Sequence, residues 1–300
     1  MTCEKLVFLG GLHRSGTTLL ARILATHPEI SGLSNTGVIE DEGQLLQSVY
    51  RSDLCHGGPG RFAFDRDAHL TEYSSLNCDD SRLRLLEAWT PYWDTSRRIW
   101  LEKSPPNLIR GRFLQALFPD SHFIFIVRHP IPTSIATYKW SGTGIYSLIH
   151  HWVEAHDLMR QDSAALKRVR IISYERFVRD PGAVLSDLES FLGISRHSYA
   201  VAPDFKVNAR YFDQWSDMFL SLTIREKPVP SRKSFYGTGN ALRDFNPKRT
   251  LKRFIKNRVF GKHRQLSNAT YEAQDAICMF EDRVQEHGYS LVNLARVPDY

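Results

Sequence analysis

The 300-residue sequence is poor in cysteine and contains no long hydrophobic run. Its four cysteines, at positions 3, 55, 78 and 278, form neither the C-x-x-C pairs nor the cysteine–histidine clusters typical of metal sites. No stretch approaches the ~18 consecutive apolar residues of a transmembrane helix. These absences argue against a metal-stabilised domain and against a membrane-spanning protein.

The first residues and the cysteines also give an expectation for the cellular location of the protein. A strand pattern begins near residue 5, which leaves no room for a signal peptide ahead of it. We therefore expect a cytoplasmic protein with free thiols. A Cys55–Cys78 bridge in an oxidising compartment stays open as the alternative.

Positive charge is concentrated in one segment. The chain has 39 basic and 33 acidic residues, a net charge of +6. Thirteen lysines and arginines lie between Arg225 and Arg264, where the only acids are Glu226 and Asp244. Such a segment suits nucleic acid, an anionic membrane or an anionic small molecule, and charge alone does not choose among them.

Strand and helix patterns alternate along the first two-thirds of the sequence. Together they predict an α/β fold of the P-loop type, a three-layer sandwich with a central, mostly parallel sheet flanked by helices. Ligands of such sheets bind at the carboxyl ends of the strands. The expected strands are 6–9, 99–102, 122–127 and 169–174, and the expected helices are 17–25, 38–50, 81–92, 106–117, 132–140 and 182–192.

We expect one domain over residues 1–300, with its core in 5–195. Segments 51–80 and 196–245 lack a sustained hydrophobic period and are predicted to be acceptor-side or cap loops. Residues 246–290 are predicted to form two closing helices, at 247–258 and 270–287.

A glycine-rich loop, Gly11–Thr18, follows the first strand pattern and opens the first helix pattern. In this context backbone N–H groups and a helix N-terminus hold phosphates. The loop of nucleotide triphosphatases has a lysine that reaches the β- and γ-phosphates, and here Thr17 occupies that position. A loop without this lysine indicates a ligand whose 5′-anion is shorter than a triphosphate.

The loop resembles a known family. Arg14–Thr18 reads R-S-G-T-T, similar to the 5′-phosphosulfate loop of sulfotransferases that use 3′-phosphoadenosine 5′-phosphosulfate (PAPS). E-K-S-P-P at 102–106, I-V-R-H-P at 126–130 and S-Y-E at 173–175 extend the resemblance over about residues 5–195. The pattern is most similar to the bacterial carbohydrate and tyrosylprotein types.

The resemblance implies an enzyme that moves the sulfuryl group of PAPS to a hydroxyl or amine by in-line displacement. Adenosine 3′,5′-bisphosphate (PAP) would leave, and neither a metal nor a nucleic-acid partner is expected. The acceptor stays open among carbohydrate, tyrosine, lipid and natural-product hydroxyls.

The resemblance also assigns donor-binding residues near the loop and the second strand. Lys103 would contact the bridging oxygen of the sulfate donor, and Arg14 would offset charge that develops during transfer. Cytosolic sulfotransferases have a catalytic histidine two residues after this lysine, where this chain has Pro105. The other loop residues assigned to the donor are His13, Ser15, Gly16, Thr17 and Thr18.

The remaining donor contacts are implied for the nucleoside and its 3′-phosphate. Arg128 would hold the 3′-phosphate, but the serine expected eight residues later is Ala136. Ser134, Thr137 and Lys139 stay open as substitutes, and Ser134 is included among the candidate site residues. Tyr174 would border the adenine. Arg232 and Lys233, in R-K-S-F-Y-G, resemble the basic cap over the 3′-phosphate.

A general base is sought in the cluster Glu40-Asp41-Glu42, because an acceptor hydroxyl must lose its proton during transfer. If 38–50 is a helix, Glu42 lies on its apolar stripe, so Glu42 is the preferred base and Glu40 the reserve. Tyrosylprotein sulfotransferases also use a glutamate soon after the first helix. Counted from His27-Pro28, the corresponding position in this chain falls nearer Ser34 or Asn35. The alternative is an acidic cluster that favours a helix N-terminus.

Two other functions stay open from the sequence. A kinase or switch protein with a degenerate loop would need Mg²⁺ and an acidic ligand at a strand end, such as Glu102 or Glu175. A polyanion-binding module centred on Arg225–Arg264 would bind in a salt-dependent way without the loop.

Overall fold

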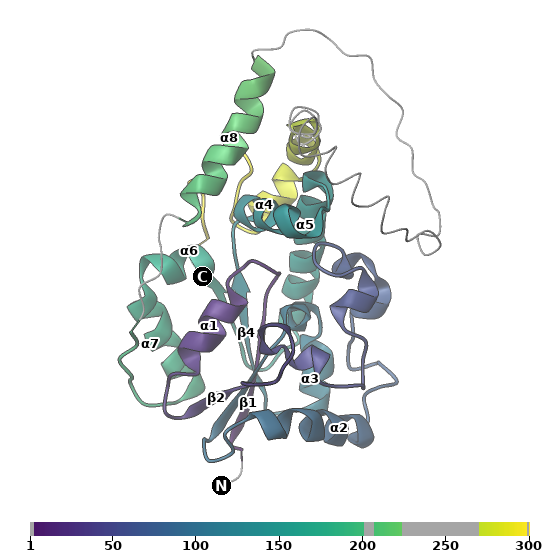
Figure 1. Ribbon diagram of the computed structural model, residues 1–300, viewed down its shortest axis with the longest axis vertical. Helices are drawn as coiled ribbons and strands as arrows, with labels where there is room; N and C mark the ends of the chain where they lie inside the picture. Colours follow the sequence, from purple (N-terminus) through teal and green to yellow (C-terminus); the bar gives the residue numbers. More distant parts are fainter. Residues whose placement is uncertain (1–2, 201–206, 224–269, 299) are drawn as a thin grey trace.

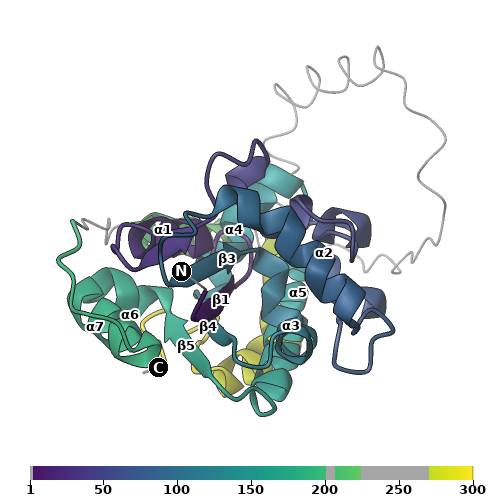
Figure 2. The same cartoon turned by 90° about the horizontal axis from the view of Figure 1, so that it is seen from below.

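The computed structural model describes residues 3–200, 207–223, 270–298 and 300. Figure 1 shows a central sheet with helices on both sides, and Figure 2 shows the same layers seen from below. Among the described residues, no helix combines the length and apolar character needed to cross a bilayer.

The sheet has five parallel strands in the order β2-β3-β1-β4-β5. Strand β4 is buried along its whole length, as its continuous apolar sequence predicts for a central parallel strand. The three-residue β2 is an edge strand that the sequence analysis did not predict. The strands are β1 Lys5–Gly10, β2 Ile30–Gly32, β3 Ile99–Lys103, β4 His122–Val127 and β5 Val169–Ser173.

Helices cover both faces of this sheet. Alternate strand residues point to opposite faces, so Phe8 and Phe123 enter one core while Val7 and Ile124 enter the other. The second core is covered by α1, α6 and α7 (Figure 2). The predicted three-layer fold is therefore confirmed. The α-helices are α1 Thr17–Leu24, α2 Asp79–Trp89, α3 Gly111–Leu117, α4 Pro130–Ser141, α5 Ile145–Ser163, α6 Tyr174–Arg179, α7 Pro181–Leu192 and α8 Ala209–Thr223, followed by a helix within 270–286.

The helix predicted over 38–50 is wrong. The segment forms two short 3₁₀ turns, Ile39–Asp41 and Gly43–Leu45. Side chains from elsewhere bind the backbone groups that a helix would have used. Lys103 Nζ donates to the Glu40 carbonyl, Trp89 Nε1 donates to the Gly43 carbonyl, and the Gln44 amide donates to Ser104 Oγ.

The two segments predicted as acceptor-side or cap loops differ in local structure, and their place at an acceptor stays a prediction. Segment 51–80 consists mainly of turns, including the 3₁₀ turns Asp53–His56, Phe62–Phe64 and Arg66–Ala68. Segment 196–245, predicted as a loop, contains helix α8, which anchors its buried Trp215 by a hydrogen bond to the Leu291 carbonyl. The first predicted closing helix, at 247–258, lies outside the described residues.

Candidate active site

The glycine-rich loop joins β1 to α1 through two residues with left-handed backbone. Arg14 has φ 68° and Gly16 has φ 104°. A Cβ at Gly16 would lie 2.7 Å from Cδ2 of Tyr174, so only glycine fits both the backbone angle and the space. The adjacent Ser15 hydroxyl is buried without a hydrogen-bond partner among the described residues. A buried orphan hydroxyl beside a helix N-terminus fits an anion that binds in this loop.

Neighbouring elements fix the loop from two sides. The Gly11 amide donates to the Pro105 carbonyl at 3.2 Å, which ties the loop to the segment after β3. Arg128 Nη1 donates to the Arg14 carbonyl at 2.8 Å, which ties it to the end of β4. The loop is therefore in direct contact with the residues that follow β3 and β4.

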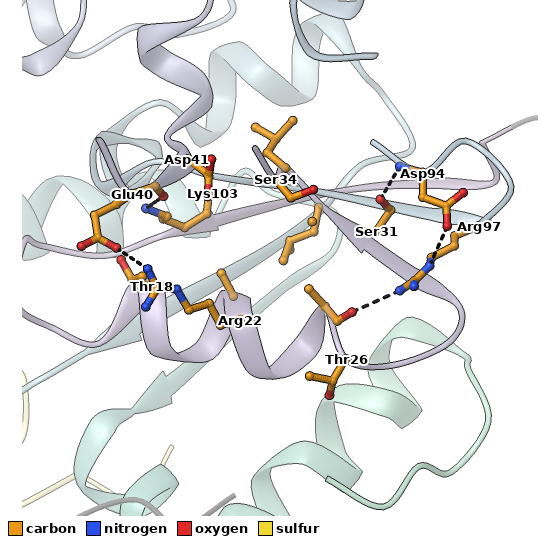
Figure 3. A pocket seen from close by; sticks show the side chains of 15 residues that line it. Thr18, Arg22, Thr26, Ser31, Ser34, Glu40, Asp41, Asp94, Arg97 and Lys103 are labelled. Atoms are coloured by element: carbon orange, nitrogen blue, oxygen red, sulfur yellow. Dashed lines mark hydrogen bonds and ion pairs between the residues drawn. The ribbon is translucent and has the colours of Figure 1, made fainter. Parts of the chain in front are cut away.

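Lys103 is the last residue of β3 and pairs in register with Leu9 of β1. Its side chain is buried, and its ammonium donates to the Glu40 carbonyl at 2.7 Å. The same nitrogen lies 3.4 Å from Oε1 of Glu42. These contacts hold the ammonium at the strand end beside α1 (Figure 3).

The two candidate bases lie in different environments. Glu42 is buried, pairs with Lys103 and accepts a 2.7 Å hydrogen bond from Gln44 Nε2. The exposed Glu40 carboxylate instead pairs with Arg22 at 3.0 Å. Glu42 therefore faces inward as predicted, although the helix from which this was inferred is absent.

A second buried carboxylate, Glu102, supports this arrangement. It accepts hydrogen bonds from Ser104 Oγ at 2.6 Å and Asn107 Nδ2 at 2.5 Å. Complete burial raises the pKa of Glu102 to about 7, against the lowering effect of these bonds and of Lys103. Ser104 also accepts from the Gln44 amide, so Glu102 is linked to the turn that bears Glu42. From the sequence, Glu102 was expected only as a possible metal ligand of a kinase, and this supporting position was not predicted.

Arg128 directly follows the last residue of β4 and is almost fully buried. Its Nε and Nη2 both donate to Oδ1 of Asn208, at 3.0 and 2.6 Å, and its guanidinium lies 4.4 Å from the centre of the Tyr174 ring. Asn208 in turn donates to Glu175 at 2.8 Å. Asn208 is a polar partner of Arg128 that no local motif indicated, because it lies 80 residues further along the chain.

Among the described residues, Ser134 forms no hydrogen bond with Arg128. It is buried in α4 and lines a separate cavity of about 10 Å³ together with Leu12 and His151. Since that volume is about one water molecule, a role for Ser134 at the nucleotide stays a prediction.

Two cavities meet at the loop end of α1. The first, about 330 Å³, has a mixed polar and apolar lining that includes Lys103, Arg22 and Arg97 (Figure 3). The second, about 290 Å³, is lined by Arg14, Thr17 and Glu42. Thr18 and Glu40 line both cavities, so the two cavities are neighbours. The candidate base Glu42 and the loop residue Arg14 both line the second one.

Three further residues were predicted to bind the donor, namely His13, Arg232 and Lys233. His13 lines the second cavity with its Nε2 3.2 Å from Oδ2 of Asp53. Arg232 and Lys233 lie outside the described residues.

The cysteines and possible metal ligands were also considered in the sequence. All four cysteines are free, so the alternative Cys55–Cys78 bridge is not formed in this structure. In the described part of the chain, no three histidine, cysteine or acidic side chains cluster closely enough to hold a metal ion, and metal independence stays a prediction.

Comparison with known proteins now decides the family. A family model described as "Sulfotransferase family" matches residues 7–198, more than half of the chain. The chain belongs to the sulfotransferase family. Within this sulfotransferase, the matched region contains the loop, Lys103, Arg128 and Tyr174.

Two curated relatives that match this chain are protein-tyrosine sulfotransferases. The sulfotransferase is 27% identical over 201 residues to protein-tyrosine sulfotransferase 2 of Gallus gallus, which covers 63% of this chain and 51% of the relative. It is 26% identical over 198 residues to protein-tyrosine sulfotransferase of Drosophila melanogaster, covering 63% and 38%. The chain thus spans about half the length, or less, of these relatives.

Solved structures with similarity include the sulfotransferase domain of the Synechococcus PCC 7002 olefin synthase. That comparison has a TM-score of 0.44 and 19% identity, covering 65% of this chain and 75% of the other. A sulfotransferase from Alicyclobacillus acidocaldarius gives a TM-score of 0.43 and 16% identity, covering 76% and 98%.

Proposed function

We propose that this chain transfers the sulfuryl group of PAPS to an acceptor hydroxyl and releases PAP. The observation that supports the proposal most strongly is the contact between the ends of two neighbouring strands. The loop after β1 has an orphan buried hydroxyl at a helix N-terminus, and β3 delivers the Lys103–Glu42 pair beside it. An anion site next to a buried cation and a buried carboxylate is suited to group transfer with proton removal.

The cationic residues have defined roles in this proposal. The loop amides and the N-terminus of α1 bind the 5′-anion of the donor. Arg14 and Lys103 offset the negative charge that develops on the oxygen left behind when its bond to sulfur breaks. Each ~1.4 kcal/mol of such stabilisation corresponds to a factor of ten in rate.

Glu42 is the proposed general base. It lines the cavity next to Arg14 and Thr17, where an acceptor hydroxyl can approach the loop. The acceptor oxygen forms its bond to sulfur while its proton passes to the Glu42 carboxylate. Gln44 and Lys103 keep this carboxylate oriented before the acceptor arrives.

Arg128 and Tyr174 are proposed to hold the nucleotide half of the donor. The Tyr174 ring lies against Gly16, and the Arg128 guanidinium lies over that ring while also bonding the loop carbonyl of Arg14. A phosphate at this guanidinium would compete with Asn208 for the same two N–H groups.

The direct test is transfer of labelled sulfate from PAPS to a panel of acceptors that includes a phenol, a tyrosine peptide and an oligosaccharide. The proposal expects label in at least one acceptor and release of PAP in equal amount. Binding of PAP without transfer to any class would leave a nucleotide-binding protein, and the proposed transferase activity would be wrong.

A further inference from the structure

Three exposed apolar side chains line a single cavity. Ile39 is 67% exposed, Leu54 is 61% exposed and Trp140 is 52% exposed, and all three line the cavity that contains Arg14 and Glu42. They come from three separate segments, namely the first 3₁₀ turn, the 51–80 segment and the end of α4. We call this cavity of about 290 Å³ the acceptor pocket; Leu45, Pro59 and Pro105 add to its apolar lining.

Clustering at one opening is unusual for side chains that merely happen to be exposed. Single exposed hydrophobic residues are ordinary, whereas a group around a concave site marks a place where an apolar partner binds. Pro59 follows Gly57 and Gly58, which both have positive φ. The chain therefore turns sharply here, and Leu54 and Pro59, on either side of the turn, line the same pocket.

The charges of the acceptor pocket disfavour an anionic partner. Glu40, Glu42 and Asp53 line it, and each already lies beside a basic side chain: Arg22, Lys103 and His13, respectively. Arg14 is the one permanently charged cation in its described lining. Arg14 is moreover assigned to the donor in the proposed function, and the donor itself is anionic. A carboxylate or sulfate on the acceptor would therefore find no uncommitted cation in the described lining and would lie next to an anionic donor, which weakens binding.

Trp140 shapes the pocket and also touches the loop. Its ring centre lies 5.1 Å from Cζ of Arg14 and 5.7 Å from the ring centre of His13. The indole therefore packs against the loop, while Trp140 stays about half exposed at the pocket. An aromatic wall of this kind favours a flat apolar group.

We propose that the acceptor is an uncharged small molecule, with one hydroxyl on a mainly apolar, ring-sized body, rather than an acidic peptide or an acidic polysaccharide. This inference rests on the proposed function, because Glu42 is taken as the base and the loop as the donor site. The hydroxyl would enter first and reach Glu42, while the apolar body would stay against Ile39, Leu54 and Trp140. A volume of about 290 Å³ is at the low end for ligand pockets and suits a body of one or two rings.

The test uses two probes that differ by one charge. Calorimetric titration of the PAP-loaded protein with 2-naphthol and with 6-hydroxy-2-naphthoate measures equilibrium binding without turnover. We expect 2-naphthol to bind roughly tenfold or more tightly than the carboxylate probe. Equal affinity, or tighter binding of the carboxylate, would overturn the inference.

Variants locate the binding at the acceptor pocket. Leu54→Ser and Ile39→Ser should each raise the Kd for 2-naphthol by roughly fivefold to tenfold and leave the Kd for PAP unchanged. Val292→Ser is the matched control, because Val292 is 66% exposed but does not line the pocket. If Leu54→Ser and Ile39→Ser bind 2-naphthol as tightly as the wild type, the assignment of the pocket is wrong.

A final comparison separates failure of the inference from failure of the proposed function. Labelled-sulfate transfer is measured with 2-naphthol and with a tyrosine peptide flanked by aspartates. A higher kcat/KM for the acidic peptide would overturn the inference while leaving the sulfotransferase activity established. Failure to bind PAP at all would overturn both.

Discussion

The ammonium of Lys103 lies 3.4 Å from Oε1 of Glu42, in a place where both side chains are buried. The pair joins the end of β3 to a turn that precedes it by 61 residues. Because Lys103 also donates to the Glu40 carbonyl, one cation fixes both the backbone and the carboxylate of this turn. The proposed activity depends on this pair more than on any other contact.

Replacing Lys103 should reduce turnover strongly. We expect Lys103→Ala to lower kcat by roughly a hundredfold or more, because a charge that stabilises the leaving oxygen is lost. The exposed Lys167→Ala serves as the control for loss of a lysine. Single-turnover kinetics with PAPS measure the effect, and wild-type rates in Lys103→Ala would remove this residue from the mechanism.

Glu42 and Glu40 should differ sharply in their importance. Glu42→Gln keeps the shape of the side chain but cannot accept the acceptor proton, so we expect kcat to fall by roughly a hundredfold. Glu40→Gln should lose far less, because the Glu40 carboxylate is exposed and its contact with Lys103 is made by the backbone carbonyl. Calorimetry with PAP accompanies the kinetics. A loss of PAP affinity in Glu42→Gln, with normal turnover at saturation, would assign Glu42 to donor binding instead.

Arg128 should read the 3′-phosphate of the nucleotide. We expect the wild type to bind PAP more tightly than AMP, and Arg128→Met to lose most of that difference, by about 1–3 kcal/mol. Asn208→Ala should have a smaller effect, since it removes a polar partner of the guanidinium and not the charge itself. Circular dichroism controls for folding of the variants. Equal discrimination between PAP and AMP in Arg128→Met would place the 3′-phosphate elsewhere.

Glu102 should make the fold less stable as the pH rises. Its pKa is about 7 in the folded chain, raised by burial above the value near 4.5 expected when unfolded. The folded state therefore holds the proton more firmly, so stability is highest below about pH 4.5 as far as this group is concerned and falls as the pH rises through 7. The shift corresponds to roughly 3 kcal/mol.

Glu102→Gln should abolish this dependence. Urea unfolding measured between pH 5 and 8 should show a steeper loss of stability in the wild type than in Glu102→Gln, with exposed Glu87→Gln behaving as the wild type. Identical slopes in the wild type and Glu102→Gln would show that this carboxyl does not bind a proton in that range.

Local patterns predicted much of the fold. The apolar run of β4 and the glycine-rich turn before α1 depend on neighbouring residues, and both were found where expected. Lys103 and Arg128 were placed correctly at the same sheet edge, because parallel strands end on one side.

The failures come from contacts between distant segments. The 38–50 helix was lost because Lys103, Trp89 and Ser104 bind its backbone groups. Asn208 became a partner of Arg128 only through folding, and no spacing rule connects two residues 80 positions apart. Predictions for Arg232 and Lys233 stay predictions, as does the single-domain organisation.

The most direct test of the central claim is calorimetric titration of the nucleotide site with PAP, without added metal, and with ATP in the presence of Mg²⁺. We expect PAP to bind at least about tenfold more tightly than ATP–Mg²⁺, a difference of about 1.4 kcal/mol. Binding of ATP–Mg²⁺ together with no measurable binding of PAP would contradict the proposed donor and favour the kinase alternative.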